Sequence, residues 1–266
     1  MAADAPLDAL ADQVKGLLPR AHAPFSNAPR AALLLLRSGT WIPGVRVESA
    51  SFSLTIPAVL NAYTTLVAAS RPDDIVAVAF AHSPSPGDVL YLDHLPDGPF
   101  RRVADTVFVH STVREHKLPA LERPLAPFLE APLHSPLDGI ECAREVSNRA
   151  HAPASAFPVG AVLELSDGRL VPGVNVEHPD WARILCAERN ALGTARSYGR
   201  TDALRMFLSC PNDSNGSPCG ACRQLLAELT PDLRLWMDRG ADAPEEQTPR
   251  ALLPGSFQGT ALLRTP

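Results

Sequence analysis

Apolar segments alternate with helix-forming segments through the second half of the chain. Short apolar runs bounded by turn residues predict β-strands, here at Val159–Leu165, Arg169–Val176, Ala203–Ser209 and Leu233–Met237. Stretches rich in Ala, Leu, Glu and Arg predict α-helices, here at Ile140–Arg149, Cys186–Tyr198 and Cys219–Leu229. The turn residues Ser166-Asp167-Gly168 are expected to join the first two strands as a hairpin. Strands that alternate with helices indicate an α/β layered domain.

The first half of the chain repeats the sequence of the second half. Arg20–Ser26 returns as Arg149–Ser155 with a single change. Without any gap, residues 20–62 and 149–191 are identical at 19 of 43 positions. Agreement this close indicates a tandem duplication of a unit that has the size of one domain.

A proline-rich segment lies between the two copies. The segment His116–Gly139 contains Pro119, Pro124, Pro127, Pro132 and Pro136. Proline disrupts helices, so this composition is typical of a linker that is not regular helix throughout. We therefore expect two domains, residues 1–128 and residues 129–266.

The composition narrows the class of protein. Hydrophobic residues make up 45% of the chain and charged residues 20%, so the chain can bury a core and is not disordered throughout. The net charge of −5, with no basic block, disfavours binding to nucleic-acid backbones. No apolar run approaches the roughly 20 residues that span a bilayer, and the N-terminus lacks a basic-then-apolar signal pattern. These features predict a soluble, cytoplasmic protein with neither nucleic-acid nor membrane partners.

The cysteines are the first candidates for chemistry. An odd number of five, with one Cys-x-x-Cys pair, argues against a disulfide scaffold and for metal-binding or reactive thiols. Cys219 and Cys222 are three positions apart at a predicted helix start, where the thiols face one side and the helix dipole favours thiolates. Cys186 begins another predicted helix. Three protein ligands with an open fourth position describe a catalytic zinc site, although spacing alone does not exclude Cys210 as a further ligand.

Glu188 supplies a candidate proton carrier beside these thiols. It follows Cys186 by two residues, so we expect it to lie near the metal without binding it, as a general acid or base requires. Arg189 comes next and is expected to offset the negative charge of three thiolates. A structural zinc knuckle or a redox pair is the alternative interpretation of the Cys-x-x-Cys pair.

These motifs resemble those of the zinc-dependent cytidine deaminase family. The resemblance is carried by Cys186-Ala187-Glu188-Arg189 and by Pro218-Cys219-Gly220-Ala221-Cys222-Arg223-Gln224. Phe157–Ala161, Gly173–Glu177 and Leu252–Phe257 are similar to other segments of the family, in the same order. The resemblance implies a three-layer cytidine deaminase-like α/β fold, a mixed sheet flanked by helices, which this chain has in tandem duplicate.

The resemblance also implies a reaction and a set of roles. Asn175 and Glu177 would bind the ribose hydroxyls, Phe157 would pack against the pyrimidine, and the Ala187 backbone would contact the base near its amino group. Zinc-bound hydroxide would attack C4 while Glu188 carries the proton to N3 and then to the leaving amino group. The expected activity is deamination of cytidine and 2′-deoxycytidine to uridine and 2′-deoxyuridine, a step of pyrimidine salvage.

The first copy lacks this chemistry. At the repeat offset, the counterparts of Cys186, Glu188, Asn175 and Phe157 are Pro57, Val59, Arg46 and Ala28. Glu48 remains opposite Glu177, but the first copy contains no cysteine. We therefore predict one zinc ion per chain and a degenerate first domain. Two-domain members of the family pair as dimers, so a homodimer is expected, although here the working copy comes second and all three ligands are cysteines.

Departures from the family pattern leave the substrate open. His178-Pro179-Asp180-Trp181 stands where the family usually has Asn-Ala-Ser-Tyr, so His178 and Trp181 are candidate specificity residues, and a reshaped loop without substrate contact is the alternative. A deaminase of another aminopyrimidine nucleoside, such as a nucleoside antibiotic, is therefore a second hypothesis. A non-enzymatic zinc protein is a third hypothesis, which predicts four protein ligands and no need for Glu188.

Overall fold

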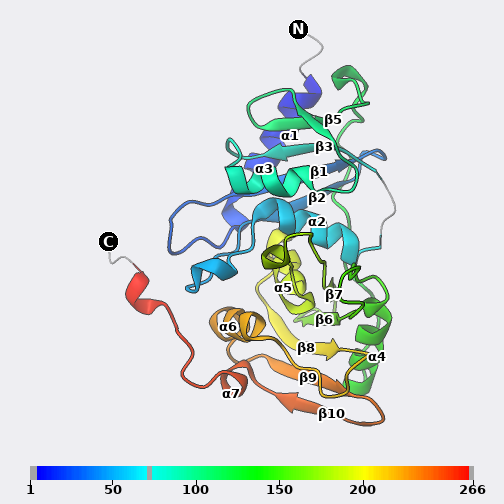
Figure 1. Cartoon of the computed structure of the whole chain (residues 1–266), viewed down its shortest axis with the longest axis vertical. Coiled ribbons are helices and arrows are strands. Elements are labelled where there is room, and N and C mark those ends of the chain that lie inside the picture. Colours follow the sequence, from blue (N-terminus) through cyan, green and yellow to red (C-terminus); the bar gives the residue numbers. More distant parts are fainter. Residues whose placement is uncertain (1–4, 71–73, 264–266) are drawn as a thin grey trace.

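The computed structural model describes residues 5–70 and 74–263, and it contains two five-stranded sheets, one in each half of the chain (Figure 1). The first sheet has the order β2-β1-β3-β5-β4. Its strands are β1 (Ala31–Leu36), β2 (Trp41–Val45), β3 (Ile75–Phe80), β4 (Phe100–Arg102) and β5 (Val107–His110). The helices of this half are α1 (Ala5–Lys15), α2 (Ala58–Ala68) and α3 (Pro86–Asp93), with 3₁₀ turns at Leu18–Arg20, Phe52–Leu54 and Glu115–Lys117.

The second sheet has the order β10-β9-β8-β6-β7. Its strands are β6 (Gly160–Leu165), β7 (Leu170–Val174), β8 (Ala203–Ser209), β9 (Arg234–Arg239) and β10 (Asp242–Gln247). The helices of this half are α4 (Pro136–Ser147), α5 (Ala187–Ser197), α6 (Gly220–Leu229) and α7 (Pro249–Leu252), with 3₁₀ turns at Trp181–Arg183 and Thr260–Leu262. Among the described residues, no helix is long and apolar enough to cross a membrane. The α/β fold in tandem duplicate is confirmed.

Helices cover both faces of each sheet. Strand β1 is buried at every position, because alternate side chains face α1 on one side and α2 on the other. In the second half α4 packs against one face and α5 against the other. Figure 1 shows α2 and α5 packed against each other between the two sheets, so the two halves share their central helices.

Two glycines let these central helices approach their sheets. A Cβ atom on Gly44 would lie 2.1 Å from the Ala58 carbonyl oxygen, and one on Gly173 would lie 2.2 Å from that of Ala187. Each glycine belongs to the strand that runs beneath the first turn of a central helix. The repeat has therefore kept the residue that sets the depth of α2 and α5 on their sheets.

Buried polar groups join the two central helices. The Asn61 side chain donates to the carbonyl oxygens of Val45 and Gly193 and to the Ser197 hydroxyl. The hydroxyls of Thr65 and Thr194 lie 2.7 Å apart. These bonds fix the orientation of the first half against α5, because leaving a buried polar group unpaired costs free energy.

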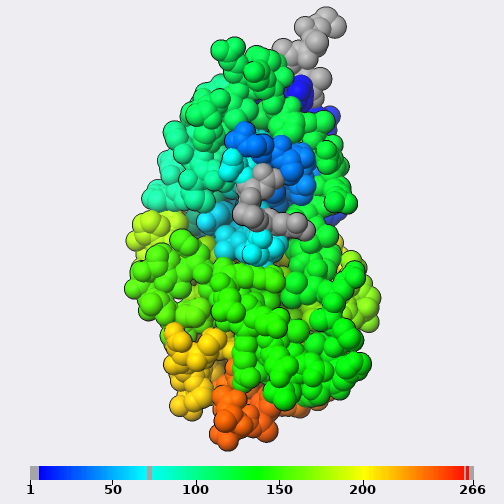
Figure 2. Space-filling model, turned by 90° about the vertical axis from the view of Figure 1, so that its right-hand side faces the viewer, coloured from blue at the N-terminus to red at the C-terminus, as the bar shows by residue number. Residues whose placement is uncertain are grey.

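The proline-rich segment is not regular helix throughout, as expected, and it contacts both sheets. Leu125 donates its backbone N–H to Trp41 of β2, whereas Leu129 exchanges backbone hydrogen bonds with Leu170 of β7. In Figure 2 the green residues of this part of the chain and of α4 run along one face over both halves. The segment therefore attaches to the edges of both sheets, and the domain boundary predicted between residues 128 and 129 stays a prediction.

The start of α4 is where the prediction was wrong. The expected helix began at Ile140, and the residues before it were assigned to the linker. The structure begins α4 at Pro136, because Ser135 and Asp138 form a capping box and proline suits the first helical turn. Strand β10 and α7 were not predicted, since the acidic sequence of β10 has no apolar run.

Candidate metal centre and substrate cavity

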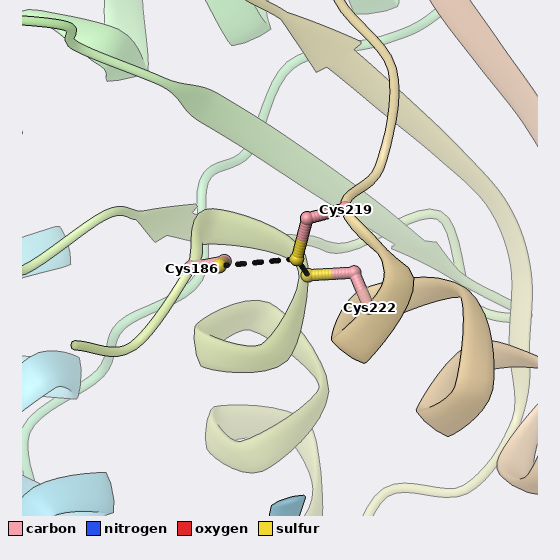
Figure 3. Close-up of side chains that lie close together, drawn as sticks. All are labelled: Cys186, Cys219 and Cys222. Carbon is pink, nitrogen blue, oxygen red and sulfur yellow. Dashed lines mark hydrogen bonds between the residues drawn. The ribbon is translucent and has the colours of Figure 1, made fainter. Parts of the chain in front are cut away.

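Three cysteine thiols meet where two helices begin (Figure 3). Cys186 caps the N-terminus of α5, Cys219 caps that of α6, and Cys222 lies in the first turn of α6. The Sγ atom of Cys219 is 3.6 Å from that of Cys186 and 3.6 Å from that of Cys222. Tetrahedral zinc with Zn–S bonds of about 2.3 Å requires sulfur atoms about 3.8 Å apart. The three thiols therefore fit a zinc ion.

The surroundings of the thiols favour a bound cation. Hydrogen bonds from the neighbouring thiols, together with the backbone N–H groups of Ala221 and Cys222, hold the pKa of Cys219 well below its usual range. The pKa values of Cys186 and Cys222 are raised, because the same contacts place negative charge beside them. A metal ion removes this competition by accepting all three thiolates.

Cys210 does not join the three thiols. Among the described residues, the ligand atoms of Cys186, Cys219 and Cys222 lie close enough together to hold one metal ion, and Cys210 is not part of this group. Cys210 is buried in the wall of the neighbouring cavity, and a Cβ atom on Gly216 would lie 2.7 Å from its Sγ atom. The spacing of the sequence left this residue open as a ligand, and the structure places it apart from the cluster.

Glu188 lies in the first turn of α5, next to the thiols. Its side chain is 3% exposed, and burial raises its pKa to about 7. Arg189 is also buried, and its guanidinium donates to the carbonyl oxygen of Leu54 in the first half of the chain. The residue beside the candidate proton carrier is thus held by the other half of the molecule.

A cavity of about 310 Å³ opens beside the thiols. Six of the predicted site residues line it: Phe157, Asn175, Glu177, Cys186, Glu188 and Cys219. Ala187 and Cys222 are fully buried behind its wall and do not line it, and neither does Arg189. Ser155, Val159, Ile184, Leu208, Cys210 and Ser217 complete the wall together with Trp181. The sequence did not predict a role in the cavity for Ser155, Ile184, Leu208 and Ser217, because they come from separate strands and loops.

The polar residues Asn175 and Glu177 in the cavity wall are held by the backbone. Glu177 accepts the backbone N–H groups of Ala154 and Ser155. Burial opposes ionisation of Glu177, but these hydrogen bonds and that of the Ser155 side chain outweigh it and lower the pKa of the carboxyl. Asn175 accepts the N–H of Val159 and donates to the carbonyl of Phe157. Both side chains therefore have fixed positions before any ligand arrives.

The two candidate specificity residues lie in different places. Trp181 lines the cavity and is 66% exposed. His178 points to the first half of the chain, where its ring centroid is 4.5 Å from that of His94 and 5.7 Å from that of Tyr91. Trp181 is therefore the one that can touch a molecule in this cavity.

The matching positions of the first half cannot form the same centre. Pro57 and Val59 begin α2 where Cys186 and Glu188 begin α5. Arg46 takes the place of Asn175, and it donates to the carbonyl of Ala28 as Asn175 does to that of Phe157. The first half therefore keeps the local backbone arrangement, but at these matching positions it has neither the cysteine ligands nor a glutamate to carry the proton.

Part of this chain is similar to several known proteins. The family model described as "Cytidine and deoxycytidylate deaminase zinc-binding region" matches residues 136–234. The chain is 39% identical to a cytidine deaminase of Halalkalibacterium halodurans over 109 residues, which are 41% of this chain and 83% of the relative. It is 38% identical to one of Sporosarcina psychrophila over 115 residues, which are 43% and 85% of the two chains. The match to a solved cytidine deaminase from Burkholderia pseudomallei covers 46% of this chain and 98% of that protein, with 33% identity and a TM-score of 0.44.

Proposed function

Because this chain belongs to the cytidine deaminase family, a family of zinc-dependent hydrolases, we propose that its second domain deaminates cytidine and 2′-deoxycytidine. The products are uridine or 2′-deoxyuridine and ammonia. The observation that carries this proposal is that one cavity is lined both by thiols with the buried Glu188 and by two fixed polar side chains, Asn175 and Glu177. A nucleoside likewise presents both a reactive amino group and sugar hydroxyls.

Glu188 carries the proton in this proposal. A zinc ion held by the three cysteines would supply a nucleophilic water near neutral pH, because it would lower the pKa of that water. Glu188 takes one proton from this water and gives it to N3 of the base as the water oxygen bonds to C4. Glu188 then takes the remaining proton from that oxygen and gives it to the amino nitrogen as the bond between C4 and this nitrogen breaks, which leaves a carbonyl at C4 and releases ammonia. Its burial beside Cys186 suits this role, because a carboxylate with a raised pKa both accepts and donates a proton near pH 7.

Asn175 and Glu177 select the sugar. Their positions are set by backbone hydrogen bonds, so they meet the ribose hydroxyls without rearrangement. Phe157, partly exposed in the cavity wall, packs against the pyrimidine ring. A contact between the Ala187 backbone and the base near its amino group stays a prediction, because Ala187 is buried and does not line the cavity. A site that bonds the hydroxyls shared by ribose and 2′-deoxyribose rejects a free base, which has no sugar, since its polar groups would be left unpaired.

Trp181 favours a second candidate substrate class. Its large exposed ring at the cavity stands where the family usually has a tyrosine, so an aminopyrimidine nucleoside with a modified sugar or base is the alternative. Turnover of such a nucleoside in place of cytidine would support that class.

The proposal extends to the state of the protein. We propose a homodimer, because Phe52 and Trp181, which occupy equivalent positions in the two halves, are both exposed apolar residues. We also propose a cytoplasmic location, because thiols stay reduced there and all five cysteines are free. Domains of residues 1–128 and 129–266 complete the proposal, with one zinc ion per chain.

The test is deamination by the zinc-loaded chain and by its Glu188→Gln variant. The parent should release ammonia from cytidine and 2′-deoxycytidine, and the variant should turn over about 10²- to 10⁴-fold more slowly while it keeps one zinc. Glu141→Gln, an exposed change on α4, is the matched control. Normal turnover by Glu188→Gln would contradict the mechanism. Two tightly bound zinc ions per chain would contradict the degenerate first domain, and a monomer by light scattering with full activity would contradict the dimer.

A further inference from the structure

A second cavity of about 180 Å³ lies between the two halves of the chain. Val59 and Tyr63 of α2 and the segment that ends α3 form one wall, and the loop after β7 forms the other. Ser49 and Ala50, the counterparts of His178 and Pro179 in the first half, are instead bridged by Glu228 of α6, which accepts hydrogen bonds from the side chain of Ser49 and the backbone of Ala50. The loop after β2 is thus joined to α6 by a carboxylate, whereas the equivalent loop after β7 borders a cavity.

The walls of this cavity are aromatic and carry little charge. Tyr63, Tyr91, His94, His151 and His178 contribute rings, and among the described residues no lysine or arginine lines it. Among the described residues, Glu177 is the single acidic residue in the wall, and its carboxylate already accepts two backbone N–H groups. The Nε2 atom of His178 is buried and has no hydrogen-bond partner among the described residues, which leaves it free to bond a ligand.

We propose that this cavity is a second binding site, which takes an uncharged planar heterocycle of nucleobase size. A cavity of about 150 Å³ is large enough to hold a benzene ring, so the volume here admits one ring or two small fused rings but not a whole nucleoside. Phosphates and carboxylates are disfavoured because no lysine or arginine in the wall would pair with them. Stacking on tyrosine and histidine rings, with His178 Nε2 as a hydrogen-bonding group, selects a heteroaromatic ring.

Glu177 borders both this cavity and the substrate cavity. A ligand in the second cavity would therefore touch the opposite side of a residue that we propose to bind ribose. The two sites are coupled where they share this wall, and the coupling must be reciprocal. The binding itself does not depend on the proposed deamination, so it can be tested without any turnover.

The test is calorimetric titration of the zinc-loaded full chain with uracil, which is planar and uncharged near neutral pH. We expect saturable binding to the parent chain and at least tenfold weaker binding to Val59→Phe, which fills the cavity from α2. The matched control is Val67→Phe, the same change on the same helix outside the cavity wall, which should bind as the parent does. Benzoate, a charged ring of similar size, should not bind.

Several outcomes would overturn the proposal. Absence of uracil binding at millimolar concentration would do so, as would equal binding by Val59→Phe and the parent chain. Uracil that is displaced by cytidine from Glu188→Gln, yet still binds Val59→Phe, would be in the substrate cavity instead. His94→Trp closes the cavity from an exposed position, so it provides the same test if Val59→Phe does not fold. None of these results depends on whether the chain deaminates cytidine.

Discussion

Glu48 in the first half and Glu177 in the second half are held in the same way. Each carboxylate accepts two successive backbone N–H groups, those of Phe25 and Ser26 or those of Ala154 and Ser155. Each half also keeps a glycine under the first turn of its central helix. The framework has therefore been preserved in both halves, although one of them has no metal ligands. The two halves thus share backbone geometry at positions where only one of them has the thiols and Glu188.

The two halves differ most after their third strand. In the second half, α6 returns the chain to β9, which lies parallel to β8. In the first half, α3 leads to the edge strand β4, and the chain then turns back into β5, antiparallel to β3. The crossover through α6 places the start of that helix, with Cys219 and Cys222, beside Cys186. The centre thus depends on topology as well as on cysteines, and cysteines added to the first half would not by themselves restore it.

Substitution of each of the two matched glutamates, Glu48 and Glu177, by glutamine should separate effects on fold stability from effects on catalysis. Glu177→Gln removes a charge that the substrate cavity uses, and a hydrogen bond to a charged group is worth about 1.5–3 kcal/mol, so kcat/KM should fall about 10- to 100-fold. Glu48→Gln should destabilise the fold by a similar free energy, which is seen as a lower thermal midpoint of unfolding, and should leave kcat/KM unchanged. Steady-state kinetics on both variants make the comparison. An equal loss of kcat/KM in both would mean that the first half takes part in substrate binding.

Alanine at the two matched glycines should sharpen the same comparison. A Cβ atom at Gly44 or Gly173 meets a carbonyl oxygen at close to 2 Å, and overpacking of this kind costs about 1–3 kcal/mol. Thermal midpoints should fall alike in Gly44→Ala and Gly173→Ala. Only Gly173→Ala should also lower kcat, because α5 carries Cys186 and Glu188. Unequal midpoints with equal kcat values would contradict this assignment.

The smallest expected effect concerns acid stability, since only the second half has the ion pair of Arg144 and Asp238. Burial of Asp238 opposes its ionisation, but Arg144, Ser209 and the Gly240 N–H outweigh this and lower its pKa. A lowered carboxyl pKa stabilises the fold above the unfolded value of about 3.9, and that stability is lost as the pH falls below it. Arg144→Met should therefore cost about 1 kcal/mol at pH 7 and less at pH 3, allowing for the partial exposure of Arg144. Urea unfolding at the two pH values tests this, and an equal loss at both would contradict it.

The sequence by itself determined the duplication and most of the second half. The helix that begins after Cys186, the strand Ala203–Ser209 and the helix of the Cys-x-x-Cys pair were all predicted close to where they lie. These features depend on local signals, namely apolar runs, caps and cysteine spacing within a few residues. The three thiols and Glu188 could be named for the same reason, because each pair of neighbouring site residues shares one helix start.

Only the tertiary structure decided what meets across the molecule. It placed Cys210 in the cavity wall but outside the metal cluster, and it turned His178 towards His94 while Trp181 remained at the substrate cavity. It also attached the proline-rich segment to both sheets. These are contacts between residues that are far apart in the chain, and no local pattern encodes them. They depend on how two copies of one fold pack together, which is fixed by the total burial of apolar surface and by hydrogen-bond partners supplied from the other half.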